Sequence, residues 1–197
     1  MCGGLRRYLL ILCACAATAL AALPAARAAD LSTPMMLVAK PELGEFYRGA
    51  VLFVRPIANG QHMGFIINRP TPVTLSKLFP EHAPSQKITD PVFLGGPVYS
   101  DTIFAVVHGD GSPGGHSVPL LEDLFLAMDV EVVDRIIEQA PQRARFIAGV
   151  VAWQPGELAH EMKSGFWFLL DPDTDLIFRK STDGLWEELV DRSANGV

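Results

Sequence analysis

The chain has 197 residues, of which 49% are hydrophobic and 19% are charged. This length and composition indicate one folded domain with a core of its own, and they exclude a disordered chain. The formal net charge of −6 disfavours nucleic-acid partners, because phosphate backbones require clustered basic residues.

Residues 1–29 have the pattern of a secretory signal peptide. Arg6 and Arg7 form a short basic region, residues 8–23 form an apolar run, and Ala26-Arg27-Ala28 is an A-x-A cleavage motif. The apolar run is too short and too rich in alanine for a convincing membrane span. We therefore expect no transmembrane span in the mature chain.

Cleavage is expected after Ala28 or Ala29, which would make the protein periplasmic or secreted, with a single domain over residues 30–197. Two alternatives stay open. The segment is an uncleaved anchor, or translation starts at Met35 or Met36 and the protein is cytoplasmic.

All three cysteines, Cys2, Cys13 and Cys15, lie inside this segment. The Leu12–Cys15 stretch also resembles a lipobox, and lipidation of Cys15 is a further alternative. A mature domain without thiols has no disulfide, no thiol nucleophile and no cysteine-ligated metal. Cleavage after Ala29 removes three of the 16 basic residues and none of the 22 acidic ones, which leaves a net charge of −9.

The first half of the domain contains mainly β-type runs. The turn dipeptide Asn59-Gly60 predicts a hairpin between the second and third runs. Thr74 is the expected N-cap of a short helix. In chain order, the expected elements are extended runs at Met35–Lys40, Ala50–Arg55 and Met63–Ile67, a helix at Leu75–Phe79, and extended runs at Val92–Leu94 and Thr102–Val107.

The second half mixes strands with longer helices. Asp129 is the expected cap of a helix whose apolar residues recur every three or four positions. The expected elements are a strand at Leu124–Ala127, a helix at Asp129–Gln139, a strand at Arg145–Trp153, a helix from Pro155 to before Gly165, a strand at Phe166–Leu170, an extended run at Leu176–Phe178 and a helix at Leu185–Asp191. Together these elements predict an α+β domain with a mixed, strongly curved sheet flanked by short helices.

Two short stretches are candidates for a ligand site. Asn68 and Arg69 follow a buried run, and Arg69 is kept extended by the next residue, a proline. Its guanidinium suits a carboxylate or phosphate. Gly95 and Gly96 can adopt positive φ and expose backbone amides to an anion. Alternatively, Arg69 forms a salt bridge with a neighbouring loop and the glycines permit a tight chain crossing.

Other chemistry finds less support in the sequence. His108, Asp110 and His116 share a glycine-rich loop, but no HExxH or paired-histidine helix accompanies them, so we expect no metal and no cofactor. No G-x-S-x-G elbow is present, and we expect no catalytic residues. An exported enzyme that uses His108 or His116 stays an alternative. No helix-turn-helix with a basic reading face is apparent, so nucleic acid is not an expected partner.

The order of several motifs resembles the YqgE/AlgH family over nearly all of the mature chain. The motifs that carry this resemblance are Leu37-Val-Ala-Lys-Pro, Met63-Gly-Phe-Ile-Ile-Asn-Arg-Pro70, Phe93-Leu-Gly-Gly-Pro-Val98, Val107-His108, Gly149-Val-Val-Ala-Trp-Gln-Pro-Gly-Glu-Leu158 with Glu161, Phe166-Trp167, and Asp175-Leu-Ile-Phe178 with Trp186.

The resemblance implies an α+β fold whose sheet bifurcates into a pseudo-barrel, and it implies no particular reaction. Members of the family are widely labelled as transcriptional regulators and usually lack an export signal. Val151 and Gln154 also replace the small residues usual in the tryptophan motif. We expect a non-enzymatic binding or regulatory module that acts outside the cytoplasm on an unidentified small anionic ligand or protein partner. The alternative start codon would make it a cytoplasmic regulator.

Overall fold

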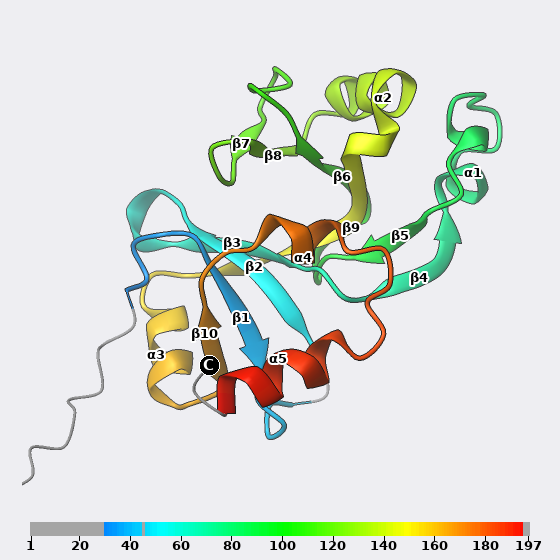
Figure 1. Ribbon diagram of the computed structural model, residues 1–197. Helices are drawn as coiled ribbons and strands as arrows, with labels where there is room; N and C mark the ends of the chain where they lie inside the picture. The colour runs from blue at the N-terminus through cyan, green and yellow to red at the C-terminus, as the bar shows by residue number, and fades with distance from the viewer. Residues whose placement is uncertain (1–29, 45, 195–197) are drawn as a thin grey trace, which may run out of the picture.

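The computed structural model describes residues 30–44 and 46–194, which form a curled sheet with short helices around it (Figure 1). The predicted signal peptide lies outside the described residues. The strands are β1 (Met35–Ala39), β2 (Val51–Pro56), β3 (His62–Ile66), β4 (Pro70–Thr74), β5 (Pro91–Leu94), β6 (Val98–His108), β7 (Val118–Pro119), β8 (Leu124–Ala127), β9 (Ala144–Trp153) and β10 (Trp167–Leu170). The helices are α1 (Leu75–Leu78), α2 (Val130–Gln139), α3 (Glu157–Lys163), α4 (Thr174–Phe178) and α5 (Leu185–Ala194). The predicted α+β class is confirmed.

The sheet forks at β9. Its main path runs β10-β1-β2-β3-β9-β6-β8-β7, and β4 and β5 lie off this path. The last residues of β9 pair antiparallel with β3, whereas Ile147 and Ala148 pair parallel with β5. β6 pairs antiparallel with β9 over most of its length. Two branches therefore diverge from one long strand, as the predicted bifurcated sheet requires.

Glycines allow the chains to cross at this fork. Gly149 has φ of 74°, a conformation that side chains strongly disfavour. A Cβ atom added to Gly95 would fall on the carbonyl of Gly149, and one added to Gly96 would fall on the backbone of Val150. The three glycines thus permit a backbone approach that no other residue type allows.

Apolar residues cover both faces of the central strands. In β1 and β2, alternate residues enter two separate cores, so both strands read as continuous apolar runs. Ile177 of α4 and Leu185 of α5 close one core, and Leu158 of α3 closes the other. The third core lies between α2 and the β6–β8 pair. Among the described residues, no helix is long and apolar enough to cross a membrane.

The predicted hairpin is confirmed. β2 and β3 pair antiparallel from Leu52–Ile66 to Pro56–His62. Asn59 and Gly60 both adopt positive φ, at 60° and 73°, because the tight turn needs left-handed residues that Asn and Gly tolerate.

Three local predictions are wrong. Leu176–Phe178 is not extended but belongs to α4, because the Asp173 side chain accepts hydrogen bonds from the amides of Asp175 and Leu176 and starts a helix. Thr74 and Asp129 precede α1 and α2 as predicted, yet neither side chain caps its helix. The Thr74 hydroxyl instead contacts the Ser76 hydroxyl.

Candidate functional site

The side chain of Asn68 forms hydrogen bonds with the backbone at the start of β2. Its Nδ2 donates to the Gly49 carbonyl at 2.8 Å, and its Oδ1 accepts from the Val51 amide at 2.8 Å. One side-chain amide therefore satisfies two backbone groups of a neighbouring loop, as buried polar groups require.

Arg69 lies against the same loop. Its guanidinium donates to the Arg48 carbonyl at 3.1 Å and sits 5.3 Å from the centre of the Phe46 ring. Burial lowers the pKa of Arg69 from its ordinary value. The chain does not end a sheet branch here, because β4 begins at the next residue, Pro70. Arg69 thus contacts the neighbouring loop through a backbone carbonyl and an aromatic ring, and the ion pairs among the described residues do not include the salt bridge that the alternative predicted.

Gly95 and Gly96 are buried, and neither has positive φ. The Gly95 amide donates to the Ala148 carbonyl at 2.8 Å rather than pointing to solvent. The predicted alternative, a tight chain crossing, is confirmed by the fork described above.

The two predicted stretches do meet, through their backbones. The Ile66 amide donates to the Gly95 carbonyl, and the Leu94 amide donates to the Arg69 carbonyl, both at 2.8 Å. The side chains of Asn68 and Arg69, however, turn away toward residues 46–51. Ligand binding by Asn68, Arg69, Gly95 and Gly96 stays a prediction.

A different arginine lies beside this meeting point. Arg145 on β9 is only 8% exposed. Its guanidinium donates to the Ile67 carbonyl at 3.0 Å and to the Arg179 carbonyl at 2.6 Å, and it stacks 4.0 Å from the centre of the Phe93 ring. Arg145 thus contacts three segments: the residue after β3, Phe93 on β5, and the segment after α4.

Arg145 also lines a pocket of about 130 Å³, large enough for a phosphate or carboxylate group. Asp90 and Lys180 contribute to the rim and Phe93 to the wall, and both rim residues are exposed. A guanidinium carries five N–H donors. The two carbonyls accept from two of them, so three N–H donors are left for another acceptor.

The charge of Arg145 is incompletely compensated. Desolvation by burial lowers its pKa to about 10, and Asp90 opposes this effect from a distance. Among the described residues, no carboxylate lies within 4.0 Å of the guanidinium. Because a buried charge is costly unless it is paired, an anion in this pocket would remove part of that cost.

Sequence reasoning missed Arg145 as a site residue. It appeared only as the first residue of the expected strand Arg145–Trp153. The available signal was its position: Arg145 directly precedes a continuous apolar run, and such runs are typical of strands that are buried on both faces.

The tryptophan motif forms a structural cluster. The Oε2 atom of Glu161 accepts from the indole nitrogens of Trp153 at 3.0 Å and Trp167 at 2.8 Å. The ring of Tyr47 packs edge-on against Trp167, with 5.5 Å between the ring centres. Burial, followed by the charges of Glu161 and Glu157, raises the pKa of Tyr47 to about 12.

The two loop histidines bond to different acids. The Nε2 atom of His108 lies 2.8 Å from Asp123, and the Nδ1 atom of His116 lies 3.1 Å from Asp129. The Asp129 carboxylate also accepts from the His116 amide, which explains why it does not cap α2. An enzyme centred on His108 or His116 stays a prediction.

Comparison with known proteins gives a consistent result. The AlgH-like family model matches residues 36–195. A UPF0301 protein of Streptomyces avermitilis is 30% identical over 169 residues, covering 83% of this chain and 87% of the relative. One from Myxococcus xanthus is 32% identical over 164 residues, covering 78% of this chain and 86% of the relative.

Solved structures share the fold. The AlgH protein of Pseudomonas aeruginosa superimposes with a TM-score of 0.66 at 22% identity, covering 83% of this chain and 88% of that one. A Corynebacterium diphtheriae protein does so with a TM-score of 0.65 at 20% identity, covering 82% and 86%. On the match of the family model over most of its length, the chain belongs to the AlgH-like family.

Proposed function

We propose that this protein is a non-enzymatic binding or regulatory module that holds a small anion at Arg145 and acts outside the cytoplasm. The observation that carries the proposal is the buried guanidinium of Arg145, which lines a pocket and has no carboxylate partner within ion-pair distance among the described residues.

The pocket chemistry favours a carboxylate or phosphate. Arginine offers a planar fork of donors that matches both groups, and the exposed Lys180 adds a second positive charge at the rim. Asp90 at the same rim disfavours anions that carry a large excess of charge. The expected ligand is therefore a compact group with one or two negative charges.

Anion binding can be tested by thermal shift with phosphate, acetate and small dicarboxylates. The wild type should be stabilised by at least one of them. Lys180→Met should lower the affinity for that anion about 3- to 10-fold, which is a loss of up to about 1.4 kcal/mol of binding free energy. Lys163→Met, which changes an exposed lysine on α3, is the matched control and should bind as the wild type does.

Arg145→Gln should bind none of these anions while remaining folded by circular dichroism. Binding that survives in both Arg145→Gln and Lys180→Met would contradict the proposal. Arg69→Ala belongs in the same panel, because loss of binding in that variant alone would assign the ligand to the predicted Asn68–Arg69 site instead.

Action outside the cytoplasm rests on residues 1–29, and the residues that follow bear on the alternative of a later start codon. The Nε2 atom of the buried His62 lies 2.9 Å from the Leu31 carbonyl, and Leu31 packs on one of the cores. The other ring nitrogen of His62 has no partner among the described residues. A chain started at Met35 or Met36 would lack Leu31 and leave His62 with no hydrogen bond there, which favours the longer chain.

The compartment is tested by N-terminal sequencing of the protein from fractionated cells. A first residue of Ala29 or Asp30 in the non-cytoplasmic fraction is the expected result. A cytoplasmic protein that begins at Met35 or Met36 would overturn export and restore the alternative of a cytoplasmic regulator.

A further inference from the structure

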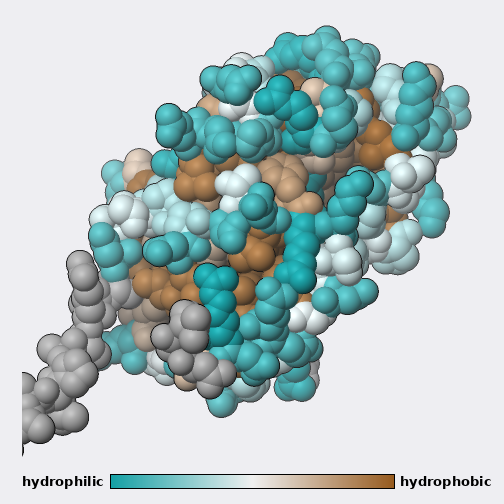
Figure 2. Space-filling view, in the orientation of Figure 1, coloured by the Kyte–Doolittle hydropathy of each residue, from teal (hydrophilic) through white to brown (hydrophobic). Residues whose placement is uncertain are grey.

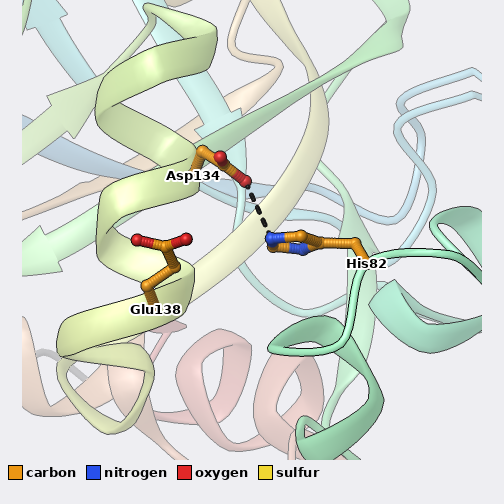
Figure 3. Close-up of side chains that lie close together, drawn as sticks. All are labelled: His82, Asp134 and Glu138. Carbon is orange, nitrogen blue, oxygen red and sulfur yellow. Dashed lines mark ion pairs between the residues drawn. The ribbon is translucent and has the colours of Figure 1, made fainter.

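We infer that His82, Asp134 and Glu138 form a zinc site between α2 and the loop that precedes η2 (Ser85–Lys87). One candidate ligand atom from each residue lies within 4.8 Å of the other two. Figure 3 shows Asp134 and Glu138 on one face of α2, with His82 reaching toward them from the facing loop. These residues are separate from the Arg145 pocket and from the loop histidines.

The distance between His82 and Asp134 is compatible with two ligands that share one metal ion. The Nε2 atom of His82 lies 3.3 Å from an oxygen of Asp134, whereas charge-assisted N–H···O bonds are usually about 2.7–2.9 Å. Two ligands of a tetrahedral zinc ion, each about 2.0–2.1 Å from the metal, lie about 3.3–3.4 Å apart. The His82–Asp134 separation is close to that edge, and the candidate ligand atom of Glu138 lies within 4.8 Å of both.

A second observation concerns the orientation of His82. Its Nδ1 atom lies 2.8 Å from the hydroxyl of Ser85, a residue that is fully buried. Metal-bound histidines characteristically use their other ring nitrogen in such a bond, which fixes the ring orientation. Here it directs Nε2 toward Asp134 and Glu138, and Ser85 acts as a positioning residue.

The loop itself is held in place before any ion binds. The side-chain amide of Gln86 donates to the carbonyls of Ser76, Phe79 and Pro80 at 3.1–3.2 Å. The His82 amide also donates to the Phe79 carbonyl at 3.1 Å. A site assembled from a helix and a braced loop needs little rearrangement to bind.

The ligand set selects the metal. One imidazole and two carboxylates suit zinc, whereas magnesium and calcium prefer oxygen ligands alone. The two carboxylates balance the charge of a divalent ion. Glu138 follows Asp134 by four positions, so both side chains lie on the same face of the helix.

Ions and a further ligand can reach the site. His82 and Asp134 also line a pocket of about 330 Å³ between α2 and the region of α1, where Figure 2 shows apolar surface framed by hydrophilic residues. Three protein ligands leave a fourth position on zinc, as in sites that bind water or a substrate.

Equilibrium dialysis of the full, untagged protein against zinc, with bound metal measured by mass spectrometry, tests the site. Cys2, Cys13 and Cys15 are first replaced by serine, so that no thiolate contributes. One zinc ion should bind per chain, in preference to magnesium and calcium. His82→Ala and Asp134→Asn should lower the affinity at least about 100-fold, and Ser85→Ala about 10-fold.

His116→Ala and Glu131→Gln are the matched controls, because they change another histidine of a His–Asp pair and another exposed acid of α2. Both should retain zinc. Circular dichroism checks that every variant is folded. No stoichiometric zinc on the parent chain, or equal affinity in His82→Ala, would overturn the proposal and leave only an ion pair between His82 and Asp134.

Discussion

The Glu161 carboxylate is the polar centre of the tryptophan cluster. Both indoles that donate to it are nearly inaccessible, at 3% for Trp153 and 4% for Trp167. Losing the carboxylate would leave two buried N–H groups without an acceptor, and such groups destabilise a fold by their full desolvation penalty. Glu161 therefore has a structural role, although it belongs to a motif that a sequence comparison alone could take for a functional one.

Glu161→Ala should lower the free energy of unfolding by about 2–4 kcal/mol. Glu161→Gln keeps an acceptor oxygen and should cost about 1 kcal/mol. Urea denaturation of both variants measures the difference, and His160→Ala, an exposed neighbour on α3, should change stability by less than about 0.5 kcal/mol. Equal losses in the alanine and glutamine variants would contradict the role given to the two indole bonds.

Because of Tyr47, the stability of the fold should depend on pH in the alkaline range. Its pKa is raised to about 12 in the fold, above about 10 in an unfolded chain. Folding therefore favours the neutral phenol. Its contribution to stability is complete below pH of about 10 and is lost as the pH rises toward about 12.

The Tyr47→Phe variant keeps the ring against Trp167 but cannot ionise. Between these pH values, the wild type should lose more stability than the variant, as measured by denaturant unfolding at each pH. Identical pH profiles of the two proteins would show that the pKa of the Tyr47 phenol is not raised in the fold.

At the scale of elements, long apolar runs predicted the sheet well. Strands such as β2, β3 and β9 are buried over most of their length, so their sequences are apolar apart from Arg55, His62 and Arg145 and are easily recognised. The hairpin followed from Asn59-Gly60. The failures are short elements governed by single polar contacts. Side-chain bonds to Asp173 make α4 helical, and β4 contains two prolines and pairs only with β5, which is where proline is tolerated in sheets.

The candidate site was harder to predict than the fold. The sequence singled out the stretches around Arg69 and Gly95, but it could not show whether they meet or which way their polar groups point. Arg145 lies 76 residues from Arg69 in the sequence, and only the fork places its side chain at the Ile67 carbonyl. Contacts of this range depend on the three-dimensional packing.

The fork itself gives a prediction at this scale. Gly96→Ala should destabilise the protein by about 3 kcal/mol or more, because the added methyl group meets the Val150 backbone, which cannot move aside. Gly111→Ala is the control, since its Cβ would have open space and its φ is not positive. Thermal denaturation of both variants measures the effect. A neutral Gly96→Ala variant would contradict the close crossing.

At the scale of the whole molecule, the residues before β1 contribute to the stability of the folded domain. A chain that starts at Met35 should be about 2–4 kcal/mol less stable than one that starts at Asp30. It loses the packing of Leu31 and leaves the buried His62 without its acceptor. Chemical denaturation of the two chains compares them. Equal stability would remove this support for a start upstream of Met35.

The proposed function depends on a small anion that binds at Arg145. The most direct measurement is the side-chain NMR signal of Arg145 Nε–H in isotope-labelled protein during titration with phosphate or a carboxylate, assigned by its absence in Arg145→Gln. This signal should shift saturably in the wild type, and Lys180→Met should weaken the binding that causes the shift. No shift at Arg145 with any anion, or a shift confined to Arg69, would contradict it.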